Sequence, residues 1–148
     1  MKEHFIRLSQ YNQWSNQRVL DGLKNQTAPE KAFALLSHIV LAESVWQMRL
    51  FAQPITTGIF EVLSLEQIEE TMCRNEAGWS SLLESTNDFS RRLDYKKLNG
   101  TPVQSSISDI LTHIFNHGTY HRAQIATHMR QAGLEPAATD FITFSRMG

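Results

Sequence analysis

The chain has 148 residues, of which 41% are hydrophobic and 20% charged, and its formal net charge at pH 7 is -1. This length and composition exclude a disordered chain and a membrane protein, and they predict a single domain over residues 1–148 with a continuous apolar core. The near-neutral charge, without a long run of Lys or Arg, disfavours nucleic-acid binding.

Two helices are predicted in the first third of the chain. Apolar residues recur at steps of three and four, which is the helical period, over about Glu3–Lys24. A second helix is expected to begin at Thr27, because its hydroxyl can cap the helix and Glu30 follows at the capping-box position. Pro54 excludes continuation of this helix beyond the region of Phe51.

A third helix and a connecting segment follow. Ser64 and Gln67 match the capping-box pattern, and the apolar spacing after them predicts a helix to about Thr86. Between Phe89 and Gln104 the helical period disappears, and Asn99-Gly100 is a strong signal for a two-residue turn. We therefore expect a small hairpin or an extended loop between the third and fourth helices.

The fourth helix is predicted to begin near Ser106, whose hydroxyl can cap it with Asp109 at the third position. Gly133 ends the helix, and Pro136 follows it. The tail is expected to pack back onto the helices because it contains three large apolar residues. These are Phe141, Ile142 and Phe144. The fold class predicted from these elements is all-α.

The single cysteine, Cys73, excludes an intrachain disulfide and a cluster of thiolate ligands. A metal ion in this protein must therefore be bound through nitrogen and oxygen. The N-terminal segment is polar and amphipathic, without the apolar stretch of a signal peptide, and no segment approaches the length of a membrane span. We expect a cytoplasmic protein that does not contact membranes.

The fourth helix carries His113, His117 and His121 at four-residue spacing, so that all three lie on one face. Two imidazoles one turn apart can converge on one metal ion, whereas a third on the same helix lies too far along the axis. His38 is the best candidate for a further ligand, because it falls on the apolar side of the second helix at a similar depth. Histidines at this spacing also occur in a polar stripe or as hydrogen-bonded core residues, so geometry alone leaves both interpretations open.

Three segments resemble the DinB-like family, and the resemblance spans nearly the whole chain. They are Tyr11-Asn12-Gln-Trp14-Ser-Asn16, His38-Ile39 with Glu43 and Trp46, and His113 to Gln124, whose closing His-x-x-x-His-Arg-x-Gln pattern is the most specific part. The resemblance implies an up-down-down-up four-helix bundle, often dimeric, with three histidines around one nickel or zinc ion. Carried over by position, these ligands are His38, His117 and His121. The family often has glycine at the position of Ala123.

Three protein ligands leave positions open for water or substrate, unlike a closed structural site with four. A divalent ion can acidify a bound water or hold a bound thiol as thiolate, and either is a nucleophile. Characterised branches of the resembling family include transferases that use low-molecular-weight thiols, a thiol-dependent isomerase and hydrolases. We therefore expect a homodimeric metal-dependent thiol transferase or hydrolase that acts on a small electrophile.

The alternative function is a non-enzymatic, metal-binding or stress-induced dimeric bundle. A role in DNA repair, the literal meaning of the family name, lacks a phosphate-binding surface. Glu43 lies about 140° around the helix from His38, which makes it a poor direct partner for the same ion. His113 can be a group behind the ligands, a proton carrier or, as we favour, a core histidine. Other candidate pocket residues, without an assigned catalytic role, are Tyr11, Asn12 and Gln124.

Overall fold

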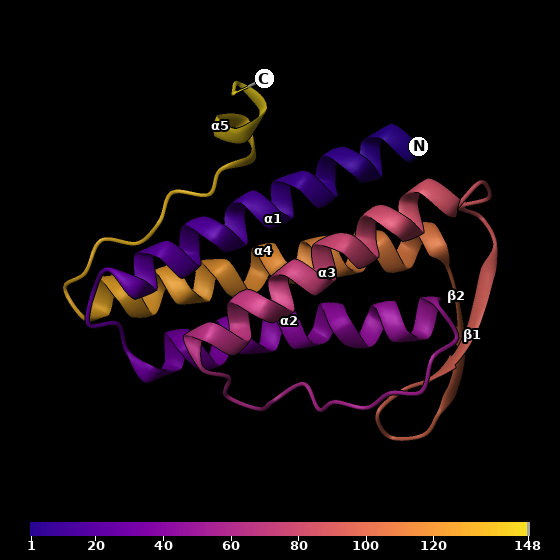
Figure 1. The fold of residues 1–148 in the computed structure, drawn as a ribbon, viewed down its shortest axis with the longest axis horizontal. Coiled ribbons are helices and arrows are strands. Elements are labelled where there is room, and N and C mark those ends of the chain that lie inside the picture. Colours follow the sequence, from indigo (N-terminus) through magenta and orange to yellow (C-terminus); the bar gives the residue numbers. More distant parts are fainter. Residues whose placement is uncertain (148) are drawn as a thin grey trace.

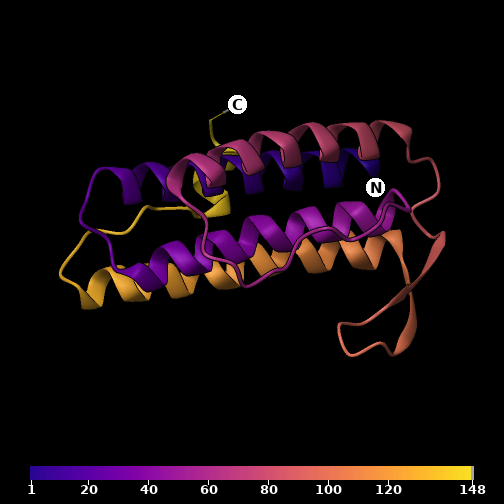
Figure 2. The same cartoon turned by 60° about the horizontal axis from the view of Figure 1, so that its bottom comes forward.

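Four long α-helices form most of the protein. The computed structural model describes residues 1–147, and Figure 1 shows α1 and α4 running in one direction and α2 and α3 in the other. Figure 2 shows two layers, one of α1 and α3 and the other of α2 and α4. The four predicted helices are thus present, as α1 (Lys2–Lys24), α2 (Glu30–Leu50), α3 (Leu65–Ser85) and α4 (Ile107–Gln131).

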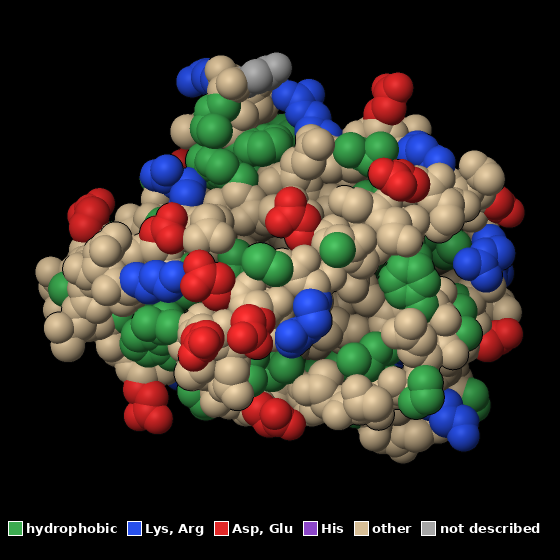
Figure 3. All heavy atoms as spheres, in the orientation of Figure 1, with side chains coloured by type: hydrophobic (Ala, Val, Ile, Leu, Met, Phe, Trp, Pro, Cys, Tyr) green, Lys and Arg blue, Asp and Glu red, His purple; other side chains and the backbone are tan. Residues whose placement is uncertain are grey.

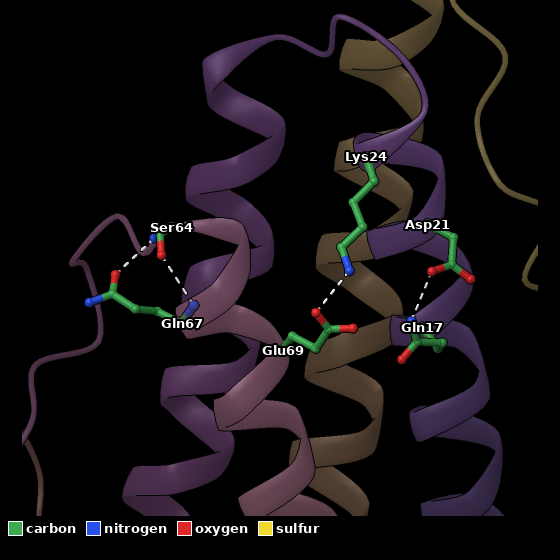
Figure 4. Close-up of polar contacts among 6 residues, drawn as sticks. All are labelled: Gln17, Asp21, Lys24, Ser64, Gln67 and Glu69. Carbon is green, nitrogen blue, oxygen red and sulfur yellow. Dashed lines mark hydrogen bonds and ion pairs between the residues drawn. The ribbon is translucent and has the colours of Figure 1, made fainter.

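The helix starts follow the predicted capping residues in two cases out of three. The Ser64 hydroxyl accepts a hydrogen bond from the Gln67 amide at 3.1 Å, and the Gln67 side chain accepts one from the Ser64 amide at 2.9 Å (Figure 4). Ser106 likewise caps α4. The predicted Thr27 cap is wrong, since α2 begins at Glu30 without a side-chain cap. Thr27 instead belongs to the turn that follows α1, and the proline before Glu30 takes the N-cap position.

The predicted hairpin between α3 and α4 is confirmed. Strand β1 (Arg92–Lys96) pairs in antiparallel register with β2 (Pro102–Ser106), and Gly100 at φ 83° occupies the turn between them. Leu93 and Tyr95 alternate toward the helices and pack against their core. The all-α fold class is therefore incomplete, because the protein is mostly helical with a small two-stranded sheet.

Two clusters of buried apolar side chains fill the space between the helices, one toward each end. The cluster near the hairpin includes Ile110 and Leu111, and the cluster at the opposite end includes Leu36 and Ile125. Within residues 1–147, no helix combines the length and apolarity needed to cross a bilayer. On the face seen in Figure 3, Lys and Arg side chains are interspersed with Asp and Glu.

A buried polar layer separates the two apolar clusters. We use this name for Asn12, Asn16, Glu43, Trp79 and Arg122. The Glu43 carboxylate accepts hydrogen bonds from the side-chain amides of Asn12 and Asn16 at 2.9 and 3.0 Å and from the Trp79 indole at 2.8 Å. The Arg122 guanidinium donates to the side-chain oxygens of both asparagines at 2.8 Å. The asparagines thus connect a buried carboxylate to a buried guanidinium and fix α4 against α1 and α2.

The C-terminal tail returns to α1, as predicted. Its short helix α5 (Phe141–Ser145) places Phe141 and Phe144 with ring centroids 5.1 and 5.7 Å from that of Tyr11. The Tyr11 hydroxyl donates a 2.7 Å hydrogen bond to the carbonyl of Thr139. Tyr11 is therefore engaged in holding the tail and does not line the histidine cluster described below.

Candidate metal centre

Three histidine side chains from two helices meet between α2 and α4. The Nε2 atom of His117 lies 3.1 Å from Nε2 of His38 and 3.1 Å from Nε2 of His121. Metal–nitrogen bonds are about 2.0 to 2.1 Å long, so two imidazoles on one ion have their nitrogens within about 4 Å of each other. The three predicted residues therefore lie close enough to hold a metal ion.

The rings of His38 and His121 are oriented by hydrogen bonds at Nδ1. The Nδ1 atom of His38 lies 2.7 Å from the carbonyl oxygen of Ile59, and that of His121 lies 2.7 Å from Oε1 of Gln124. Both partners are acceptors, so each Nδ1 carries the proton and donates it. In the neutral rings, Nε2 then presents a lone pair, which is the form that binds a metal ion.

A hydrogen-bonded cluster without a cation accounts for this arrangement less well. If His38 and His121 both present lone pairs at Nε2, a proton on Nε2 of His117 can satisfy only one of them. The Nδ1 atom of His117 is buried without a hydrogen-bond partner among the described residues, with or without a cation at Nε2. A cation at the point where the three Nε2 atoms converge satisfies all three lone pairs at once, and the donor set fits a divalent ion.

Two of the three histidines, His117 and His121, have lowered pKa values. Burial, together with the neighbouring histidines, lowers the pKa of His117 to about 3. Burial likewise lowers the pKa of His121, and the nearby charge of Lys31 acts in the same direction. An imidazole must be unprotonated to bind a metal ion, so His117 is available as a ligand at neutral pH without first losing a proton.

A cleft opens beside the cluster. It has a volume of about 590 Å³ and is lined by His38 and His121 together with side chains that include Phe60 and Gln124. The Phe60 ring stacks on the His38 ring at a centroid distance of 5.2 Å and an interplanar angle of 3°, although Phe60 is itself 77% exposed. His38 and His121 are therefore reachable from the cleft, and the Phe60 ring covers one face of His38.

The remaining candidate residues lie in several places. His113 is exposed at the surface, with its ring centroid 5.6 Å from the ring of Trp46, so the preferred interpretation as a core histidine is wrong. Its ring centroid lies 5.8 Å from that of His117, because a residue four positions earlier is displaced by a full turn along the axis. Glu43 and Asn12 belong to the buried polar layer.

Sequence reasoning missed two partners of the cluster, the Ile59 carbonyl and the ring of Phe60. Both lie in the segment between α2 and α3, where no periodic pattern indicates which residue faces the helices. The sequence analysis predicted only that Gln124 could line the pocket. Its position three residues after His121, on the same helix face, could have indicated a contact between the two side chains. The structure gives it a defined partner, the Nδ1 atom of His121.

Comparison with known proteins gives consistent results over the whole chain. The model of the DinB family matches residues 1–148. Protein DinB of Bacillus subtilis (strain 168) is 24% identical over an alignment 160 residues long. The alignment covers 95% of this chain and 93% of that protein. The crystal structure of a DinB-like protein from Bacillus cereus ATCC 10987 has a TM-score of 0.68 at 23% identity, and the match covers 92% of this chain and 95% of that one. At this identity the structural likeness concerns the fold.

Proposed function

The chain belongs to the DinB family, and on this basis we propose that it is a divalent-metal-dependent enzyme whose ion is held by His38, His117 and His121. In this proposal the ion is nickel or zinc. The enzyme directs a low-molecular-weight thiol, or water, at a small electrophile, as a thiol transferase or a hydrolase. The observation that carries the proposal is the convergence of three Nε2 atoms beside an open cleft.

Each residue of the cluster has a defined part in this proposal. The Ile59 carbonyl and the Gln124 side chain hold the rings of His38 and His121 so that Nε2 faces the common point. Three neutral ligands leave the charge of the ion uncompensated, and when bound it would hold a thiol as thiolate or acidify a water near neutral pH. Phe60 shields one side of His38 from solvent.

The choice of a thiol as the first nucleophile rests on the resemblance to characterised members of the family. On the same ground we propose a homodimer with the up-down-down-up bundle topology, located in the cytoplasm. Partners in the reaction would be the thiol and the electrophile, and neither nucleic acid nor a membrane would take part.

Metal analysis of untagged protein, purified without chelator, tests the proposed site. We expect one equivalent of nickel or zinc in the wild type, loss of the ion in His117→Ala, and retention in His4→Ala, which removes an exposed histidine on α1 far from the cluster in sequence. A wild-type protein that binds no divalent ion after incubation with nickel and zinc salts would refute the metal centre.

Turnover is tested separately, with metal-loaded protein, glutathione or cysteine as thiol, and 1-chloro-2,4-dinitrobenzene as electrophile. We expect conjugation that is lost in His121→Ala and unchanged in His4→Ala. Strong stabilisation by the metal without conjugation or hydrolysis across a panel of thiols and electrophiles would instead support the non-enzymatic, metal-binding bundle.

A further inference from the structure

The cleft beside the histidine cluster has a cationic end. Lys31 precedes His38 by seven residues on α2, and His128 follows His121 by seven residues on α4. Seven residues are about two helical turns, so each lies on the same face as its histidine and about 10 Å along the axis. Figure 1 shows α2 and α4 running in opposite directions, so both positions fall at the same end of the cleft. Both side chains line the cleft.

The lining of the cleft gives Lys31 no acidic partner among the described residues. Asp and Glu are absent from the lining of the cleft in the described chain. The ion pairs found among residues 1–147 are Lys24–Glu69, drawn in Figure 4, and Arg74–Glu70, and neither includes Lys31. A ligand in this cleft therefore meets a positive field from Lys31 and from a divalent ion, without a compensating carboxylate.

The other walls of the cleft suit the middle of a small organic molecule. Ala34, Leu35 and Phe60 are apolar and line the cleft, and Ala34 and Leu35 lie between Lys31 and His38 along α2. The flexible four-carbon stem of Lys31 lets its ammonium group approach the cluster along the cleft. A molecule with only a few carbons between two polar ends can therefore contact both the ion and Lys31.

We propose that Lys31, with His128 beside it, binds the anionic end of the small-molecule thiol whose sulfur faces the three histidines, so that the preferred thiol carries a carboxylate. This ligand class rests on the proposed function. Lys31 acts here as a specificity-determining residue, because it distinguishes acidic from neutral thiols of the same size. His128 adds a ring nitrogen that can donate a hydrogen bond to the same group.

Ligand binding to the full chain loaded with cobalt provides a test that does not depend on turnover. The thiolate-to-metal charge-transfer band is titrated with 3-mercaptopropionate and with its neutral amide, 3-mercaptopropionamide. We expect the acid to bind about tenfold more tightly at low salt, as a charge-assisted hydrogen bond would give. In Lys31→Gln this preference should fall close to one, with cobalt content and affinity for the amide unchanged.

Lys24→Gln is the matched control, because it removes a lysine of the same charge that pairs with Glu69 away from the cleft. It should leave the preference for the acid intact. Equal affinities for the two thiols in the wild type, or a preference that survives in Lys31→Gln, would overturn the role of Lys31 and leave the proposed function standing. If neither thiol produces the band, both the ligand class and thiol activation are wrong.

Discussion

The substitution Gly118→Ala tests whether the buried polar layer is as closely packed as the structure indicates. A Cβ atom at this position would lie 2.7 Å from the side-chain oxygen of Asn12 and 2.8 Å from the guanidinium of Arg122. Both atoms are buried and bonded to each other at 2.8 Å, so neither can move aside without breaking that hydrogen bond. We therefore expect Gly118→Ala to lower the free energy of unfolding.

The expected change in the free energy of unfolding combines one stabilising and two destabilising effects. Alanine in place of glycine inside a helix stabilises by about 1 kcal/mol. Overpacking a close contact costs about 1 to 3 kcal/mol, and loss of a hydrogen bond to a buried charged group costs about 1.5 to 3 kcal/mol. The expected net loss is roughly 2 to 4 kcal/mol, which corresponds to a decrease in Tm of roughly 5 to 15 °C for a domain of this size.

Gly22→Ala is the matched control. Gly22 also lies inside a long helix, but a Cβ there would approach only the Cβ of Ala137, at an ordinary 4.0 Å. The control should therefore keep the helix-propensity gain and raise the free energy of unfolding by up to about 1 kcal/mol. Urea denaturation of the metal-free proteins, followed by far-UV circular dichroism, measures both changes. If Gly118→Ala is as stable as Gly22→Ala, the close packing of Asn12 and Arg122 around α4 is refuted.

Three further predictions concern the histidine cluster. Zinc should raise the Tm of the wild type with increasing concentration but not that of His38→Ala, because the ion binds an arrangement that only the folded chain provides; equal shifts by calorimetry would contradict this. In metal-free protein the pKa of His117 is lowered to about 3. The unfolded chain therefore binds a proton at this residue more readily than the folded chain does. The contribution of neutral His117 to the free energy of unfolding is thus fully present above pH 6.5 and decreases as the pH falls toward 3. Between pH 7 and 5 we expect a loss of about 1 kcal/mol after discounting for solvent screening, and a smaller pH dependence in His117→Ala. Phe60→Ala should change the free energy of unfolding by less than about 0.5 kcal/mol, because the ring is exposed, but weaken zinc affinity in a chelator competition; unaltered affinity would show that the stacked ring does not support His38.

The sequence predicted the histidine cluster because its members lie on two regular helices. The four-residue spacing of His117 and His121 specifies one face of α4, and the apolar pattern around His38 specifies the inward face of α2. The two helices then only had to pack against each other, which their apolar surfaces favour. No comparable rule places Ile59 or Phe60, because the segment between α2 and α3 is not periodic and its path is set by tertiary contacts.

The errors have equally local causes. Thr27 matched a capping pattern, but it lies in the turn after α1, and α2 begins after Pro29. For His113 the shared stripe with His117 suggested burial, whereas its side chain is exposed even though Ile110 and Ile114 on either side of it are buried. In both cases the predicted helix is present, and the error concerns its first residue at Thr27 and the burial of one side chain at His113.

Two adjacent rows of side chains on α4 explain how one helix can serve both the histidine cluster and the buried polar layer. His117-Gly118 and His121-Arg122 repeat at four-residue spacing, and adjacent residues point about 100° apart around the axis. One row of side chains therefore faces α2, where the Nε2 atoms converge, and the other faces Asn12, where the guanidinium is held. The buried hydrogen bonds of Arg122 fix the rotation of α4, and the same rotation sets the direction of the two imidazoles. A change that rotates α4 to relieve the polar layer must for this reason also displace the histidines from their common point.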